Sequence, residues 1–163
     1  RSGKSDLYEG GVRIPTMIHW PGVSTAGAVC SAPIITMDLY PTILEMTGAP
    51  GDATYNENVD GASLVPLIRH SDAALGREAI FWHYPHYQAA TPYGAVRSGP
   101  WRLIEFYEDM RIELYNLDND LGETTDLATQ LPDQAARLRS MLHAWRDEVG
   151  AQMPLRAPFD EAH

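Results

Sequence analysis

The sequence predicts an α/β fold: the closing strand and helix of an α/β layer, then a small antiparallel sheet packed by a helix near the C-terminus. Three observations predict it. Strand, loop and helix signals follow one another in the first third of the chain, aromatic and β-branched runs recur through its middle, and apolar residues near its end keep helical spacing. The 163 residues, 44% of them hydrophobic, are enough to bury the core of one ordinary domain.

The first elements are a strand and a helix. Apolar side chains occupy most even positions of residues 12–20, and Pro21-Gly22 closes the run, which predicts a strand. In the stretch "TMDLYPTILEMTG" we expect Thr36 to cap a helix that ends at Gly48.

The middle of the chain predicts antiparallel strands. The runs "EAIFWHYPHY", "YGAVRSGPWRLIEFYED" and "MRIELYNLD" are aromatic and β-branched. They are interrupted by Ser98-Gly99-Pro100 and by a charged turn around Glu108-Asp109. Such spacing is typical of a small antiparallel sheet.

The last element is a helix over residues 132–149. Pro132-Asp133 suits a first helical turn, and Gly150 ends the pattern. The apolar residues at helical spacing are Leu138, Met141, Leu142, Trp145 and Val149. We expect this stripe to lie on the sheet.

These elements divide the chain into three parts. We expect residues 1–77 to form the end of an α/β domain, residues 78–153 to form a C-terminal subdomain of sheet and helix, and residues 154–163 to form an irregular tail. Because the sequence starts at Arg1, inside an apparent motif, we expect a piece of a longer protein. A severed α/β domain exposes sheet edges and apolar faces, so we expect association with the missing N-terminal part or self-association.

Charge, hydropathy and cysteine content argue against several kinds of partner and site. The formal net charge of -10 makes the chain a poor candidate for binding nucleic acid or an anionic membrane surface. No apolar run approaches the roughly 18 residues that a membrane helix needs. The single cysteine, Cys30, excludes an internal disulfide and a cysteine-based metal cluster.

Two familiar ligand motifs are incomplete. Lys4 and Ser5 after a glycine look like the end of a phosphate-binding loop, but Gly10 and Gly11 interrupt the long helix that such a loop requires. In "NLDNDLGETTDLA" Asn116, Asp118 and Asp120 alternate as in a calcium loop. The required glycine and the glutamate at the twelfth position are both replaced by leucine, so we assign no metal to this chain.

Three residues are candidates for a site. Lys4 lies in a glycine-flanked stretch, where flexible backbone can bring its ammonium close to anionic oxygens; the alternative is a solvated surface lysine. His83 and His86 flank Tyr84-Pro85, and no nearby carboxylate or cysteine completes a metal site. Packing within a turn and contact with a ligand both stay open for the two histidines.

Several segments, taken together and in order, resemble a known family. They are "GKSDLYEGGVRIPTMIHWPG", "TMDLYPTILEMTGA", "DGASLVPLI", "AIFWHYPHY", "YGAVRSGPWRLI" and "ELYNLDNDLGETTDLA". They resemble the C-terminal portion of a type I sulfatase, the formylglycine-dependent, arylsulfatase-like branch of the alkaline phosphatase superfamily. The resemblance covers nearly the whole chain and implies an alkaline phosphatase/sulfatase-like α/β fold.

The resemblance implies roles for residues near the start. The lysine before Glu-Gly-Gly-x-Arg, here Lys4, is expected to contact the sulfate and the departing ester oxygen. Glu9 and Arg13 are expected to brace the turn that aims it, and the two glycines to allow backbone angles closed to other residues. Ser5 stands where the family often has glycine. His83 or His86 is expected to contact the alcohol part of the substrate, a sulfate-ester small molecule or a sulfated glycan.

The resemblance also implies what this chain lacks. The family's nucleophile is a formylglycine made in a Cys/Ser-x-Pro-x-Arg motif, and Cys30 in "AVCSAPI" has no such arginine. The calcium ligands of the family also lie upstream. We therefore expect Ca²⁺ and formylglycine to be supplied by the missing N-terminal part, and this chain alone to be inactive. The residues do not determine the compartment; the resemblance favours an extracytoplasmic one, which is periplasmic, secreted or lysosomal. A phosphonate monoester hydrolase or phosphodiesterase of the same superfamily, and a non-catalytic paralogue, are the alternatives.

Overall fold

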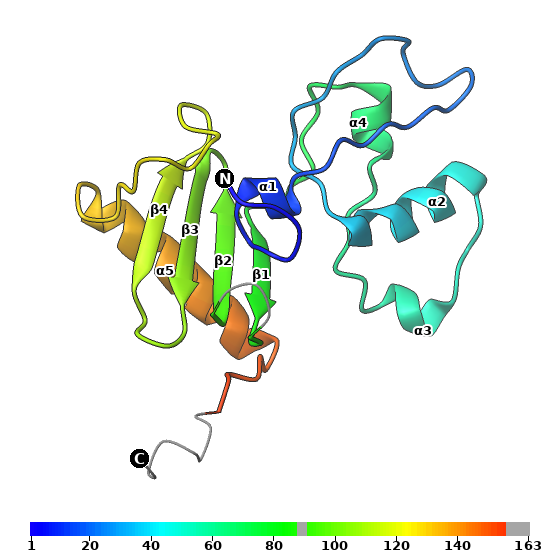
Figure 1. Cartoon of the computed structure of the whole chain (residues 1–163). Helices are drawn as coiled ribbons and strands as arrows, with labels where there is room; N and C mark the ends of the chain where they lie inside the picture. The colour runs from blue at the N-terminus through cyan, green and yellow to red at the C-terminus, as the bar shows by residue number, and fades with distance from the viewer. Residues whose placement is uncertain (88–90, 156–163) are drawn as a thin grey trace. The chain divides into compact units, whose positions relative to one another are not determined.

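The computed structural model describes residues 1–87 and 91–155 (Figure 1). The chain forms two compact units. One, the sheet unit, consists of Arg1–Ile14 and Glu78–His163, and the other, the helical unit, is Pro15–Arg77. One boundary between the units lies after residue 77. Most of the expected tail at 154–163 lies outside the described residues.

Residues 1–14 belong to the sheet unit rather than to the segment that follows them, in contrast to the division expected from the sequence. Leu7 and Tyr8 are buried in a core of the sheet unit, and this burial places the N-terminal segment on the sheet. Sequence order alone suggested the opposite grouping.

The sheet is antiparallel, with its four strands side by side in chain order. The strands are β1 (Ile80–Tyr84), β2 (Tyr93–Ser98), β3 (Trp101–Phe106) and β4 (Ile112–Asn116). Gly99 has a φ of +57°, a left-handed angle that suits glycine in the tight turn between β2 and β3. The sheet expected from the sequence is confirmed.

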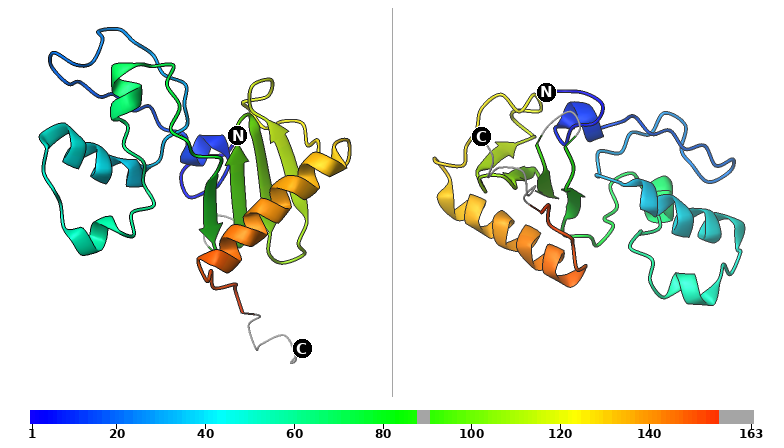
Figure 2. Two further views of the ribbon diagram at one scale, coloured as in Figure 1. Left: turned by 180° about the vertical axis from the view of Figure 1, so that it is seen from behind. Right: turned by 60° about the horizontal axis from the view of Figure 1, so that its bottom comes forward.

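Each face of the sheet carries its own core. One face, the N-terminal face, is covered by the start of the chain, and the other, the α5 face, by helix α5 (Pro132–Glu148), as Figures 1 and 2 show. The core of the N-terminal face contains Leu7, Tyr8, Tyr93, Ala95, Ile104, Phe106, Tyr115 and Leu117. The core of the α5 face contains Val96, Leu103, Leu114, Ala135, Leu138 and Leu142. Alternate residues of each strand point to opposite faces, which produces the two sets.

Helix α5 confirms the predicted apolar stripe. Leu138 and Leu142 are fully buried, and the Trp145 ring stacks on Phe81 with 5.0 Å between centroids. Val149 is 53% exposed, so the buried stripe ends earlier than expected. Gly150, at a φ of +60°, follows the helix as predicted.

The strand expected over residues 12–20 is absent. Helix α1 (Glu9–Val12) occupies its first position, and residues 13–20 have no regular structure. A strand needs a neighbour for its backbone hydrogen bonds, and residues 15–77, all of them described, include no strand. Ile14 and Met17 are 72% and 94% exposed.

The helical unit is built around short helices. They are the 3-10 helix η1 (Thr36–Asp38), α2 (Leu39–Thr47), α3 (Ala53–Asn56) and α4 (Val65–Arg69). Thr36 begins η1 and does not cap it; instead the Asp38 carboxylate accepts the Ile35 N–H at 2.9 Å. Gly48 ends α2 as expected, with a φ of +68°.

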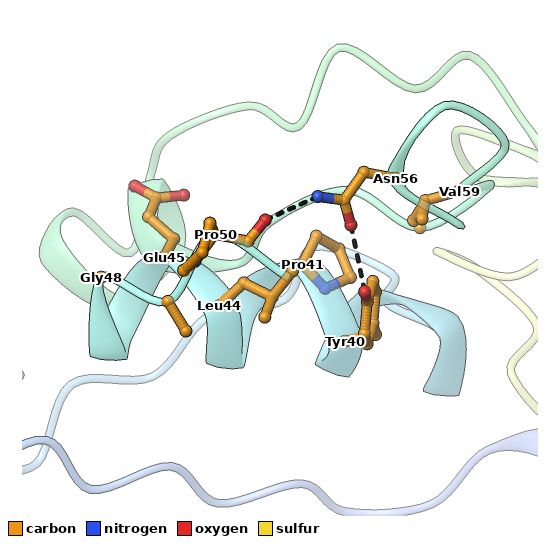
Figure 3. A pocket seen from close by; sticks show the side chains of 10 residues that line it. Tyr40, Pro41, Leu44, Glu45, Gly48, Pro50, Asn56 and Val59 are labelled. Carbon is orange, nitrogen blue, oxygen red and sulfur yellow. Dashed lines mark hydrogen bonds between the residues drawn. The ribbon is translucent and has the colours of Figure 1, made fainter. Parts of the chain in front are cut away.

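Asp38 also joins distant segments of the helical unit. Its fully buried carboxylate accepts the Ala62 N–H at 2.9 Å and pairs with Arg77. Beside α2 lies a hollow, whose rim Figure 3 shows: Tyr40 donates to the Asn56 amide oxygen at 3.0 Å, and Asn56 donates to the Pro50 carbonyl at 2.7 Å. None of the helices in the described part of the chain has the length and apolar character of a membrane span.

Glu105 is buried on the α5 face and fastens the helix to β3. The His143 ring lies 2.9 Å and the Arg146 guanidinium 2.8 Å from its carboxylate, and Arg139 donates to it as well. Burial opposes ionisation of Glu105, but hydrogen bonds from His143 and Arg139 and the charge of Arg146 outweigh it. The pKa of Glu105 is therefore lowered.

This network predicts a loss of stability in acid. A carboxyl group whose pKa is lower in the folded state stabilises the fold above its unfolded pKa, near 4.5, and loses that contribution as the pH falls through its folded pKa. At pH 7 we expect Glu105→Gln to lower the free energy of unfolding. Between pH 7 and pH 3 we expect the free energy of unfolding of this variant to fall less steeply than that of the unmodified protein. Urea midpoints across this range measure both effects. Glu148→Gln, at the exposed end of α5, is the control. An unchanged pH dependence in Glu105→Gln would contradict the assignment.

Candidate functional site

Lys4 lies in a tight turn. The Asp6 N–H donates to the Gly3 carbonyl at 3.2 Å, which closes a four-residue turn over residues 3–6, here called the Lys4 turn. Ser5 is its third residue and has a φ of +76°. A type II turn requires a positive φ at this position and favours glycine there. This backbone angle gives a physical reason for the glycine that the family often has where this chain has Ser5.

Both ends of the Lys4 turn are held in place. The Asp6 carboxylate accepts the Ser2 hydroxyl at 2.6 Å and the Leu7 N–H at 2.7 Å. The Tyr93 hydroxyl donates to the Ser5 carbonyl at 3.4 Å. The turn is thereby tied to a strand of the sheet as well as to its own flanks.

Gly10 and Gly11 are required by close packing. Neither has a positive φ, so the expectation of special backbone angles is wrong. A Cβ added to Gly10 would lie 2.5 Å from the Arg1 carbonyl oxygen, and one added to Gly11 would lie 2.7 Å from the Gly3 carbonyl oxygen. The missing side chains let α1 pack directly against the backbone that carries Lys4.

A buried set of charges holds α1 on the sheet. It consists of Arg102 on β3, Glu9 on α1 and Glu123 after β4, with Arg97 and the half-exposed Arg13 at its edge, and is here called the Arg102 network. Arg102 pairs with the Glu9 carboxylate, and its Nε lies 3.4 Å from the Glu123 carboxylate. Arg13 lies 3.3 Å from Glu9, which agrees with the expected brace, and Arg97 lies 3.8 Å from it.

Burial shifts the pKa of two members of this network, Arg102 and Glu123. The Arg102 and Glu123 side chains are fully buried and Glu9 is 4% exposed. Desolvation lowers the pKa of Arg102, against the attraction of both carboxylates, and raises the pKa of Glu123. The sequence reasoning missed Arg102. The available signal was the spacing of Arg102 and Ile104. Residues two apart in a strand point to the same face, so an arginine beside a core isoleucine indicates a buried charge.

His83 lies on the other side of the sheet from the Lys4 turn. His83 pairs with Gly94 in the β1–β2 register. The next residue of β2, Ala95, belongs to the core of the N-terminal face, so Gly94 and its partner His83 point to the opposite face. One ring nitrogen is 2.7 Å from the Tyr107 hydroxyl and the other 2.9 Å from the Gln152 carbonyl. Both nitrogens are engaged within the chain, as in the packing interpretation.

His86 lies on the side of the Lys4 turn. Its exposed ring meets Tyr84 edge-on at 5.5 Å between centroids, and Tyr84 stacks on Tyr93 at 5.7 Å. Tyr93 is the residue that donates to Ser5. Two tyrosines thus connect His86 to the Lys4 turn, whereas the structure does not bring His83 together with Lys4.

The arrangement presents a cation to solvent. Lys4 is exposed, and within the described residues no hydrogen bond or ion pair engages its ammonium. The same part of the chain contains no group of three His, Cys, Asp or Glu side chains that could hold a metal ion. An exposed, unpaired ammonium on an anchored turn is suited to an anionic oxygen supplied from outside the chain.

Comparisons with known proteins give a consistent result. The family model described as "N-sulphoglucosamine sulphohydrolase, C-terminal" matches residues 3–149. A sulfatase of Formosa agariphila is 36% identical over 159 residues, which cover 89% of this chain and 29% of that protein. Human arylsulfatase D is 37% identical over 98 residues, which cover 59% of this chain and 16% of that protein.

A solved structure is similar as well. It holds a protein in complex with its substrate D-glucosamine-2-N,6-O-disulfate, and it superposes with a TM-score of 0.76 at 25% identity. The match covers 91% of this chain and 31% of that one. The chain therefore spans about a third or less of the length of these relatives.

Proposed function

Because this chain belongs to the N-sulphoglucosamine sulphohydrolase C-terminal family of sulfatases, we propose that it is the C-terminal part of a longer enzyme, the parent, which hydrolyses sulfate esters. In this proposal Lys4 contacts the sulfate group. The observation that carries it is the unpaired, exposed ammonium of Lys4 on a turn anchored to the sheet.

The chemistry of ester cleavage suits this cation. As the bond between sulfur and the ester oxygen breaks, negative charge grows on the departing oxygen while the sulfate oxygens stay anionic. A fixed ammonium stabilises both, and it requires little reorganisation when its turn is already held. The hydrogen bonds at both ends of the Lys4 turn supply that rigidity.

The parent is proposed to bring formylglycine as nucleophile and Ca²⁺ as the ion that holds the sulfate. The described residues of this chain do not fit a calcium ion, since they include no suitable ligand cluster. We place both groups in the upstream part, and we expect this chain alone to be inactive. The helical unit has exposed apolar side chains, among them Ile43 and Val29, that this upstream part would cover.

The proposed substrate class is a sulfated sugar. The similar solved structure holds a sulfated glucosamine as its substrate, and the matching family model is described as that of an N-sulphoglucosamine sulphohydrolase, which supports this class. His86 is the proposed contact to the alcohol part, because tyrosines connect it to the Lys4 turn. His83, bonded at both ring nitrogens on the other face, is a structural residue in this proposal.

A comparison of esters tests the function. We expect the parent to turn over an aryl sulfate and a sulfated glucosamine faster than the matched aryl phosphate or phosphonate monoester. A preference for the phosphorus esters would assign the parent to a phosphonate or phosphodiester hydrolase of the same superfamily. No turnover of any of them by the intact, folded parent would indicate a non-catalytic paralogue.

A further inference from the structure

Neither a strand nor a long helix adjoins the Lys4 turn in the chain to fix its position. α1, which follows it, is four residues long. Besides the Tyr93–Ser5 hydrogen bond and the hydrogen bond from Arg1 to Tyr115, the connection between the turn and the sheet depends on residues 7–9, whose side chains are all buried. Apolar contacts are non-directional, so the directional contacts at these residues decide where the turn sits.

Arg102 supplies two of the directional contacts from the sheet, alongside the Tyr8 hydroxyl, which donates to Glu113 on β4 at 2.6 Å. Its guanidinium donates to the Leu7 carbonyl and to the Glu9 carboxylate, so one side chain of β3 binds the backbone and the side chain of the segment that carries Lys4. Arginine presents its donors in a rigid planar fork, and lysine offers a single flexible ammonium. The fork fixes both the position and the orientation of the segment.

Glu123 completes the attachment from a second element. Its carboxylate accepts the Glu9 N–H at 2.7 Å and also lies beside Arg102. Glu123 itself has a φ of +52°, an angle that non-glycine residues seldom adopt. Such strained residues persist where surrounding contacts over-determine them and are found most often near functional sites.

A buried charge network is a costly way to hold a loop if stability alone is at stake. Replacing such a network with well-packed apolar residues is often neutral or stabilising. Here apolar side chains already surround it: Leu7 and Tyr8 are both buried beside it. The geometry points to a role for the charges in fixing one conformation of the segment.

We propose that Arg102 is a positioning residue for the reaction, which acts through Glu9 and Leu7 to hold the Lys4 ammonium at the departing ester oxygen. This inference rests on the proposed function of Lys4. It predicts that Arg102 matters to turnover only while Lys4 is present.

A double-mutant cycle in the parent tests the inference with a series of aryl sulfates whose leaving groups differ in pKa. We expect Arg102→Lys to lower kcat about tenfold to a hundredfold with little change in KM, since small misplacements of a catalytic group have effects of this size. The loss should increase as the leaving group becomes more basic, and Lys4→Ala should show the same trend. In the Lys4→Ala background, Arg102→Lys should change kcat by no more than roughly twofold.

Arg146→Lys is the matched control. Arg146 is also a buried arginine paired with a carboxylate, but it lies on the α5 face. The Arg146→Lys variant should leave kcat and its dependence on the leaving group unchanged, even if it lowers the urea midpoint. If Arg102→Lys does not fold, Glu123→Gln removes the charge of the second carboxylate with little change in shape and should show the same coupling to Lys4.

The outcomes separate the two claims. Equal losses from Arg102→Lys with and without Lys4, or the same loss from Arg146→Lys, would overturn the positioning role and leave the function of Lys4 intact. Full activity of Lys4→Ala would overturn the proposed role of Lys4 and this inference with it.

Discussion

Replacing Lys4 with alanine in the parent is expected to lower turnover of a sulfate ester at least a hundredfold. The removal of one fixed electrostatic contact to a developing oxyanion typically raises the barrier by about 2.7 to 4 kcal/mol, or about a hundred- to a thousandfold in rate. Folding should be unaffected, because the Lys4 side chain is exposed and unpaired within the described residues. Steady-state kinetics on an aryl sulfate give kcat directly.

Two variants serve as controls for this experiment. Arg137→Ala removes one positive charge from α5, where the side chain is 46% exposed, and should leave turnover unchanged. Ser5→Gly keeps Lys4 and relieves the left-handed angle at position 5, so turnover should be retained. Normal turnover in Lys4→Ala would remove Lys4 from the site.

The largest stability effect is expected from Arg102→Ala. Removing one partner of a buried ion pair leaves the other charge buried without compensation, which typically destabilises a protein by about 3 to 5 kcal/mol. Here two carboxylates, Glu9 and Glu123, would lose their shared buried cation. We expect a large fall in the free energy of unfolding of the parent, measured in urea.

Arg111→Ala is the comparison for this variant. Arg111 pairs with Glu113 on β4, but its side chain is 50% exposed, and exposed pairs contribute about 0 to 1 kcal/mol. A loss in Arg102→Ala no larger than the loss in Arg111→Ala would show that the Arg102 network does not hold the N-terminal segment on the sheet.

Elements with strong local signals were predictable from the sequence. The β2–β3 turn could be placed because Ser98-Gly99-Pro100 interrupts two apolar runs, and Gly99 indeed takes a left-handed angle. α5 could be placed because Pro132 marks its start and Leu138 and Leu142 keep the spacing of one helical face. In these cases the local pattern and the tertiary packing agree.

The strand over residues 12–20 could not be judged from its own pattern. Alternating apolar residues predict a strand, but a strand forms only where another supplies backbone hydrogen bonds, and none is present in residues 15–77. The exposed Met17 and Ile14 follow from that missing neighbour.

The site was only partly predictable. Lys4 could be singled out from the sequence, but the network that anchors its turn joins residues about a hundred positions apart, such as Glu9 and Arg102. No local spacing indicates that contact. The separation of His83 from His86 had a signal: residues three apart in or near a strand tend toward opposite faces, because side chains alternate.

The most direct test of the account is a crystal structure of an inactive parent variant with a sulfated sugar bound. We predict the Lys4 Nζ within about 2.7 to 3.2 Å of an oxygen of the sulfate or of the scissile ester, at hydrogen-bonding distance. An ammonium directed into bulk solvent, away from the bound sulfate, would contradict the central claim that this lysine takes part in the reaction.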